Sequence, residues 1–182
     1  MTAVTRWLRA VRERYLHARR RRVVRWSIDA LVIALVMIVA GALQTRRHLG
    51  AGTAPRATLT TLAGTQVELE SFRGKPTLLA FWAPWCGVCK VESQNVSWAM
   101  HLAGGAANVV SIAAEFEQVD DVRRFIGEHD ADYPVLLGTR RLTEQFAIEG
   151  FPTVYFLDAD GRVKSSVVGY TSTLGLLVRL FF

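Results

Sequence analysis

The chain has 182 residues, which is enough for one domain and a short appendage. Its net charge of +6 is uneven, because residues 1–50 carry eleven arginines against two acidic side chains, a balance of +9, whereas residues 51–182 carry a balance of −3. The basic character therefore belongs to the N-terminal tail, and it gives no reason to propose nucleic-acid binding by the rest of the chain.

The basic segment at residues 1–25 contains nine of these arginines, four of them in a row. Apolar side chains interleave with the arginines at roughly helical spacing: Trp7, Leu8, Val11, Tyr15 and Leu16. Two interpretations remain open. The segment is either a basic amphipathic helix on an anionic membrane surface or a disordered positive region.

An apolar segment follows at residues 26–43, with Asp29 near its first end. Its 18 residues make about 27 Å of helix, close to the thickness of a bilayer core. The arginines before it outnumber those after it, so we expect the N-terminus to stay in the cytoplasm and the rest to be exported. Ala40-Gly41-Ala42 also fits a signal-peptide cleavage site, but the basic region is long for a signal peptide, which favours an uncleaved transmembrane helix.

Residues 44–56 read as a linker that contains Gly50, Gly52 and Pro55, and residues 57–182 as one domain. The alternating runs at 58–62 and 65–69 predict a β-hairpin at the start of that domain. With either interpretation of residues 26–43, the domain and its cysteines reach an oxidising compartment, which in a bacterium is the periplasmic side of the inner membrane.

The chain's only two cysteines, Cys86 and Cys89, are separated by two residues. The apolar run at 77–82 before them predicts a buried strand, and residues 90–102 after them predict a helix. The cysteines therefore lie at a strand-to-helix turn, with Cys86 at the opening of the helix.

This position favours a reactive thiol at Cys86. Unpaired N–H groups and the positive end of the helix dipole stabilise a thiolate at a helix N-terminus. Helix N-termini and C-x-x-C spacing lower the pKa of a cysteine below its ordinary value of about 8.5. Cys86 is then a nucleophile, and Cys89, one turn further, is placed to resolve a mixed disulfide.

Three other interpretations of the cysteine pair are weaker. A structural disulfide that closes so short a loop would add only about 2 kcal/mol. A zinc site needs two more ligands, and no two of the four histidines are spaced as a ligand pair. A copper thiolate site lacks a methionine-rich partner, because the chain has only three methionines.

The remaining elements complete an α/β pattern. We expect strands at 108–113, 153–157 and 163–168, and helices at 119–128, 140–147 and 172–182. Residues 133–137 either cover a sheet edge or begin a strand. Asp158-Ala159-Asp160-Gly161 predicts a tight turn between two antiparallel strands. The fold class is therefore α/β, with a mixed central sheet flanked by helices.

Two motifs carry a resemblance to a known family. The segment Trp82 to Lys90 resembles the active-site motif of thioredoxin-fold proteins, and Gly150-Phe151-Pro152-Thr153 resembles their loop with a cis-proline. The resemblance covers about residues 57–182. It is closest to membrane-anchored thiol–disulfide reductases of the TlpA/ResA/CcmG type, and it extends to the suppressor-of-copper-sensitivity branch.

The resemblance implies roles for individual residues. It implies that the bond before Pro152 is cis and that the substrate contacts Trp85, Gly87, Val88, Phe151 and Pro152. Trp82 is expected in the core. Glu92 is on the helical face of Cys89, where the family's glutamate is associated with proton transfer to the thiols; the alternative is a solvated glutamate. Ala80 stands where thioredoxin has a buried aspartate, so Glu92 is the remaining carboxylate in the matched region.

The function expected from these residues is reduction of protein disulfides by an exported, membrane-tethered domain, with the Cys86–Cys89 disulfide as the redox group and no other cofactor or metal. The resemblance implies a transmembrane electron donor of the DsbD type. Three alternatives remain open: a Cu(I)-handling dithiolate protein, a disulfide oxidase or isomerase, and a redox-inert binding module.

Overall fold

The computed structural model describes residue 32, residues 52–129 and residues 131–182. The basic segment at 1–25 lies outside these residues, as do the expected transmembrane helix at 26–43, apart from residue 32, and most of the linker at 44–56. Within the described part of the chain, no helix is both long enough and apolar enough to cross a membrane.

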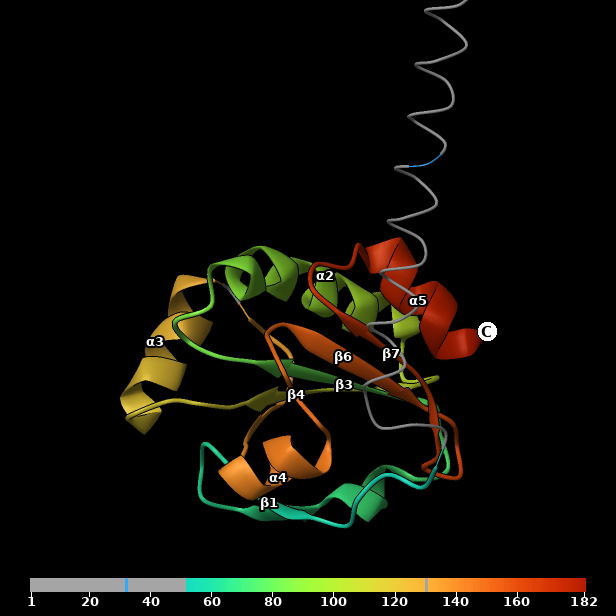
Figure 1. Ribbon diagram of the computed structural model, residues 1–182, viewed down its shortest axis with the longest axis horizontal. Helices are drawn as coiled ribbons and strands as arrows, with labels where there is room; N and C mark the ends of the chain where they lie inside the picture. Colours follow the sequence, from blue (N-terminus) through green and yellow to red (C-terminus); the bar gives the residue numbers. More distant parts are fainter. Residues whose placement is uncertain (1–31, 33–51, 130) are drawn as a thin grey trace, which may run out of the picture. The chain divides into compact units, whose positions relative to one another are not determined.

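Seven strands form one mixed sheet in the order β2-β1-β5-β4-β3-β6-β7 (Figure 1). The strands are β1 (Thr58–Thr61), β2 (Gln66–Glu68), β3 (Thr77–Trp82), β4 (Asn108–Ala113), β5 (Val135–Leu137), β6 (Thr153–Leu157) and β7 (Val163–Val168). β4 runs parallel to β3 and to β5, and every other neighbouring pair is antiparallel. The expected mixed sheet is confirmed.

Helices cover both faces of the sheet (Figure 1). They are α2 (Gly87–Ala103), α3 (Val119–Glu128), α4 (Arg140–Gln145), α5 (Thr173–Phe181) and a short 3-10 helix, η1 (Leu69–Phe72). Alternate residues of β3 point to opposite faces. Leu78 packs in the core with α2, α3 and α5, whereas Leu79 packs with α4 and η1 in a second core. With a core on each side, every residue of β3 is buried.

Leu69 differs from its predicted form, and residues 133–137 take the second of their two predicted forms. Leu69, predicted at the end of a strand, begins η1, because its side chain is buried in the second core while β2 stops at Glu68. Residues 133–137 do not cover an edge: β5 begins at Val135 and lies between β4 and β1. Its outer side is covered by β1, with Thr60 opposite Leu137.

The chain enters the domain at the end of the sheet opposite the cysteines. Thr53 bridges Arg162, and the Ala54 N–H donates to the Gly161 carbonyl at 2.9 Å, in the turn between β6 and β7. β6 runs antiparallel to β3, so that turn lies near Thr77 at the start of β3. Cys86 follows the other end of β3. The cysteines and the first described residues of the domain therefore lie at opposite ends of the sheet.

Candidate active site

Cys86 is the N-cap of α2, so the helix begins at Gly87, three residues earlier than the periodicity predicts. The Cys86 Sγ accepts a hydrogen bond from the Cys89 N–H at 3.1 Å, and the Cys86 N–H donates to the Ala83 carbonyl at 3.0 Å. One tight turn after β3 thus places Cys86 at the start of the helix. The position predicted for this residue at the opening of the helix is confirmed.

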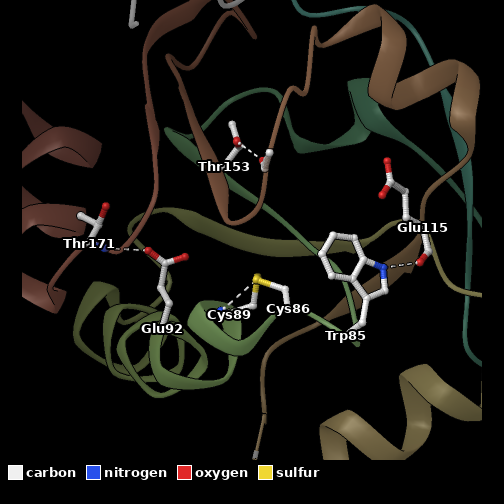
Figure 2. Close-up of a disulfide and its surroundings, with 8 residues drawn as sticks. Trp85, Cys86, Cys89, Glu92, Glu115, Thr153 and Thr171 are labelled. Atoms are coloured by element: carbon white, nitrogen blue, oxygen red, sulfur yellow. Dashed lines mark hydrogen bonds between the residues drawn. A yellow bond between two sulfur atoms is a disulfide. The ribbon is translucent and has the colours of Figure 1, made fainter. Parts of the chain in front are cut away.

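The two cysteines form a disulfide with their Cα atoms 5.3 Å apart (Figure 2). Both are buried, at 5% exposure for Cys86 and 2% for Cys89. Both side chains belong to the core between α2 and the sheet, and Cys86 is the slightly more exposed of the two. Reduction would place a thiolate at Cys86 against the positive end of the α2 dipole.

Glu92 is buried on α2 one turn after Cys89, at 2% exposure. Its Oε1 accepts a hydrogen bond from the Thr171 N–H at 2.8 Å, and Figure 2 shows the carboxylate on the same side of α2 as the disulfide. Burial raises the pKa of Glu92 to about 7, against the opposing effect of the Thr171 hydrogen bond. A solvated helix glutamate does not fit this burial. Glu92 is the single buried carboxylate among the described residues.

The structure brings together a pair of hydroxyl groups beside Glu92 that the sequence analysis did not predict. Ser93 and Tyr133 are both buried, and their hydroxyl oxygens lie 2.8 Å apart. Burial raises the pKa of Tyr133 to about 12; the hydrogen bond with Ser93 lowers it, and the charge of Glu92 raises it further. The two residues are 40 positions apart, so no local pattern indicates that they meet.

Exposed aromatic and aliphatic side chains surround the disulfide. Trp85 is 65% exposed, and its Nε1–H donates to the Glu115 carbonyl at 2.9 Å (Figure 2). The ring of Phe151 meets the Trp85 ring edge-on, with centroids 5.8 Å apart. Val88 is 47% exposed on the first turn of α2. The Phe151-Pro152 bond is cis, as expected.

Trp82 belongs to the core, as predicted. It is 4% exposed, and its ring stacks on that of Phe125 in α3 at 4.1 Å. Beside Trp85, the surface between the active-site turn and α3 is hollowed by about 420 Å³. Lys90, Glu115 and Arg124 are among the residues that line this hollow. Polar and aromatic groups thus meet next to the disulfide.

In the described part of the chain, no three histidine, cysteine or acidic side chains are grouped so that they could hold a metal ion.

The family model described as AhpC/TSA family matches residues 51–166. The chain belongs to the AhpC/TSA family. A "Thioredoxin-like protein" from Haemophilus influenzae is 34% identical over 129 residues, which cover 70% of this chain and 75% of that protein. The "Thiol-disulfide oxidoreductase ResA" from Bacillus cereus is 28% identical over 120 residues, which cover 64% of this chain and 68% of the relative.

Among solved structures, a secreted Mycobacterium tuberculosis disulfide oxidoreductase, described as homologous to E. coli DsbE, is similar to this chain with a TM-score of 0.62. It is 26% identical and covers 69% of this chain and 94% of its own. The thioredoxin fold is therefore confirmed. The family, the relatives and the disulfide together identify a thiol–disulfide oxidoreductase of the ResA and DsbE type.

Proposed function

We propose that this chain is an exported, membrane-tethered oxidoreductase that reduces protein disulfides through Cys86 and Cys89. The observation that carries the proposal is the disulfide itself, with Cys86 as the cap of α2 and Cys89 buried behind it. A structural disulfide gains little from so short a loop. A redox pair gains a stabilised thiolate from the helix start.

The reaction proceeds by two thiol–disulfide exchanges. The Cys86 thiolate attacks one sulfur of a substrate disulfide, the substrate S–S bond breaks, and the other substrate sulfur leaves as a thiolate. The Cys89 thiolate then attacks the Cys86 sulfur, so that the Cys86–Cys89 bond forms and the second substrate thiolate leaves. Two electrons pass from the dithiol to the substrate, and the two thiol protons follow them.

Glu92 is proposed as the general acid and base for this proton movement. Glu92 lies one turn after Cys89 on α2 and is buried like that residue, which supports a role toward the thiol that must lose a proton in the second exchange. A pKa of about 7 lets the group accept and return a proton near neutral pH.

Substrate contact is proposed for Trp85, Gly87, Val88, Phe151 and Pro152. Trp85 and Val88 are exposed apolar side chains on either side of Cys86, and exposed apolar surface of this kind marks a binding face. Phe151 supports the Trp85 ring from the other side of the site. The hollow beside Trp85 leaves room for the polypeptide that flanks the substrate disulfide.

Export and tethering are proposed from the N-terminal sequence, where the arginine-rich segment precedes 18 mostly apolar residues. The similar Mycobacterium tuberculosis protein is described as secreted, which agrees with an exported domain. In a bacterium this places the domain in the periplasm on a single-pass anchor. Electrons then come from a transmembrane donor of the DsbD type, because a dithiol in an oxidising compartment needs a partner that keeps it reduced.

The direction of exchange is tested by the reduction potential of the Cys86–Cys89 pair, measured in the full chain against glutathione buffers. A value near thioredoxin's, about −270 mV, supports a reductase, whereas one near DsbA's, about −120 mV, supports an oxidase. An insulin-reduction assay completes the test: the wild type should reduce insulin, and Cys86→Ala should not. Tight stoichiometric Cu(I) binding without catalysis would contradict the proposal and support a copper-handling protein.

A further inference from the structure

The buried hydroxyl pair of Ser93 and Tyr133 has no role in the exchange reaction as described so far. Ser93 is 1% exposed and Tyr133 is 5% exposed, and both lie against the apolar core under α2. Their mutual hydrogen bond offsets the cost of taking two hydroxyl groups out of water, but an alanine and a phenylalanine would fill nearly the same space with no such cost to offset. The pair therefore invites a functional explanation.

Ser93 lies directly below the resolving cysteine on α2. It follows Cys89 by four residues, so the two side chains occupy the same face of the helix, with Cβ atoms about 5–6 Å apart. The Cα–Cβ bonds of a helix tilt toward its N-terminus, so the Ser93 side chain lies over the turn between Ser93 and Cys89. Both residues are buried on that face.

One of the two hydroxyl protons in the pair is not engaged in the hydrogen bond between Ser93 and Tyr133. Two hydroxyls carry two protons, and the bond between Ser93 and Tyr133 engages one of them. Among the residues that the structure describes, neither hydroxyl has another hydrogen-bond partner. If Tyr133 donates to Ser93, the Ser93 proton is left free to point up α2.

We propose that the Ser93 hydroxyl donates a hydrogen bond to the Cys89 sulfur when Cys89 is a thiolate, and that Tyr133 is the positioning residue that orients Ser93 for this contact. This inference rests on the proposed function. In the disulfide the Cys89 sulfur is uncharged and a weak acceptor; as the attacking thiolate it is a strong one. The hydrogen bond therefore favours the ionised, nucleophilic form of Cys89.

The contact acts in the second exchange only. The Cys89 thiolate attacks the Cys86 sulfur of the mixed disulfide, the bond from Cys86 to the substrate breaks, and the substrate sulfur leaves with the electron pair. The proton that Cys89 gave up to become a thiolate ends on the departing thiolate. Ser93 keeps its own proton throughout, and Cys86 makes its first attack without help from the pair.

The test is a stopped-flow measurement on the reduced full chain in detergent micelles, with a peptide disulfide that carries a fluorophore and a quencher on its two halves. Dequenching as the quencher half leaves reports attack by Cys86, and the fall in fluorescence anisotropy as the fluorophore half leaves the protein reports resolution by Cys89. Cys89→Ala supplies the reference without resolution. Ser97→Ala is the matched control, because Ser97 is a buried serine on α2 one turn further from Cys89.

We expect Ser93→Ala and Tyr133→Phe each to slow resolution about tenfold, equivalent to about 1.4 kcal/mol, and to leave the attack phase unchanged. The double variant should be no slower than Ser93→Ala, because Tyr133 acts through Ser93. Ser93→Thr, which keeps the hydroxyl, should restore resolution, and Ser97→Ala should match wild type.

Resolution that stays at the wild-type rate in Ser93→Ala would overturn the inference, as would equal slowing of both phases or additive effects in the double variant. Tyr133→Phe keeps the ring in place, so it tests the hydroxyl even if Ser93→Ala fails to fold. Absence of any exchange by the wild-type chain would instead refute the proposed function itself, which keeps the two failures distinct.

Discussion

Replacing Glu92 by glutamine should make the protein more stable at high pH and leave its stability at low pH nearly unchanged. Glutamine has the same shape and keeps an oxygen that accepts from the Thr171 N–H. It removes only the ionisation of the buried carboxyl group. The variant therefore isolates the free energy of ionising a carboxyl group that the fold has taken out of water.

The magnitude follows from the shift in pKa. Burial raises the pKa of Glu92 from its ordinary value of 4.5 to about 7, so the folded state favours the protonated form. The stability that this provides is present in full below pH 4.5 and is lost as the pH rises through about 7. At about 1.4 kcal/mol per pKa unit, the wild type should lose roughly 3 kcal/mol relative to Glu92→Gln across this window.

The assay is urea unfolding of the oxidised full chain, for wild type and Glu92→Gln, from about pH 4 to about pH 9. The difference in free energy of unfolding should be near zero at the acid end, rise through the window and then level off in favour of the variant. Glu149→Gln is the control, because Glu149 is exposed and should give no such rise. A difference that does not change with pH, or a variant less stable than wild type at the basic end, would refute the argument from burial.

Three further predictions test the site and the core. Cys86→Ala should abolish insulin reduction. Cys89→Ala should accumulate a covalent adduct with the substrate, detected by mass spectrometry. If neither variant formed such an adduct, the assigned order of attack would be contradicted. Trp85→Phe removes the indole N–H that donates to Glu115, and we expect a KM about fivefold higher with unchanged kcat, equivalent to about 1 kcal/mol. Phe81 is fully buried against Phe146 and Tyr155, so Phe81→Ala should lower the free energy of unfolding by about 3–5 kcal/mol in urea.

The parts of this structure that follow from the sequence depend on local patterns. The buried strand at 77–82 and the helix at 119–128 have the predicted bounds, because a continuous apolar run and a 3.6-residue period are read within a few residues. The position of Cys86 was predictable for the same reason, since it depends only on where the strand ends and the helix begins.

The rest depends on contacts between distant residues. Thr171 reaches Glu92 across 79 positions, and Tyr133 reaches Ser93 across 40. Neither partner belongs to a motif, so periodicity gives no sign of them. The place of β5 inside the sheet depends likewise on its pairing with β1, a contact set by tertiary packing. The sequence therefore predicted which face of the helix Glu92 occupies, but only the structure showed that this face is buried at Glu92.

The most direct test of the whole account is the pH dependence of alkylation at Cys86 in the reduced full chain, followed by mass spectrometry and compared with the same chain unfolded in urea. Because folding places this sulfur at the start of α2, the account predicts a midpoint for Cys86 clearly below that of the unfolded chain. The same midpoint in the folded and unfolded chains would contradict the claim that the helix start makes Cys86 the nucleophile.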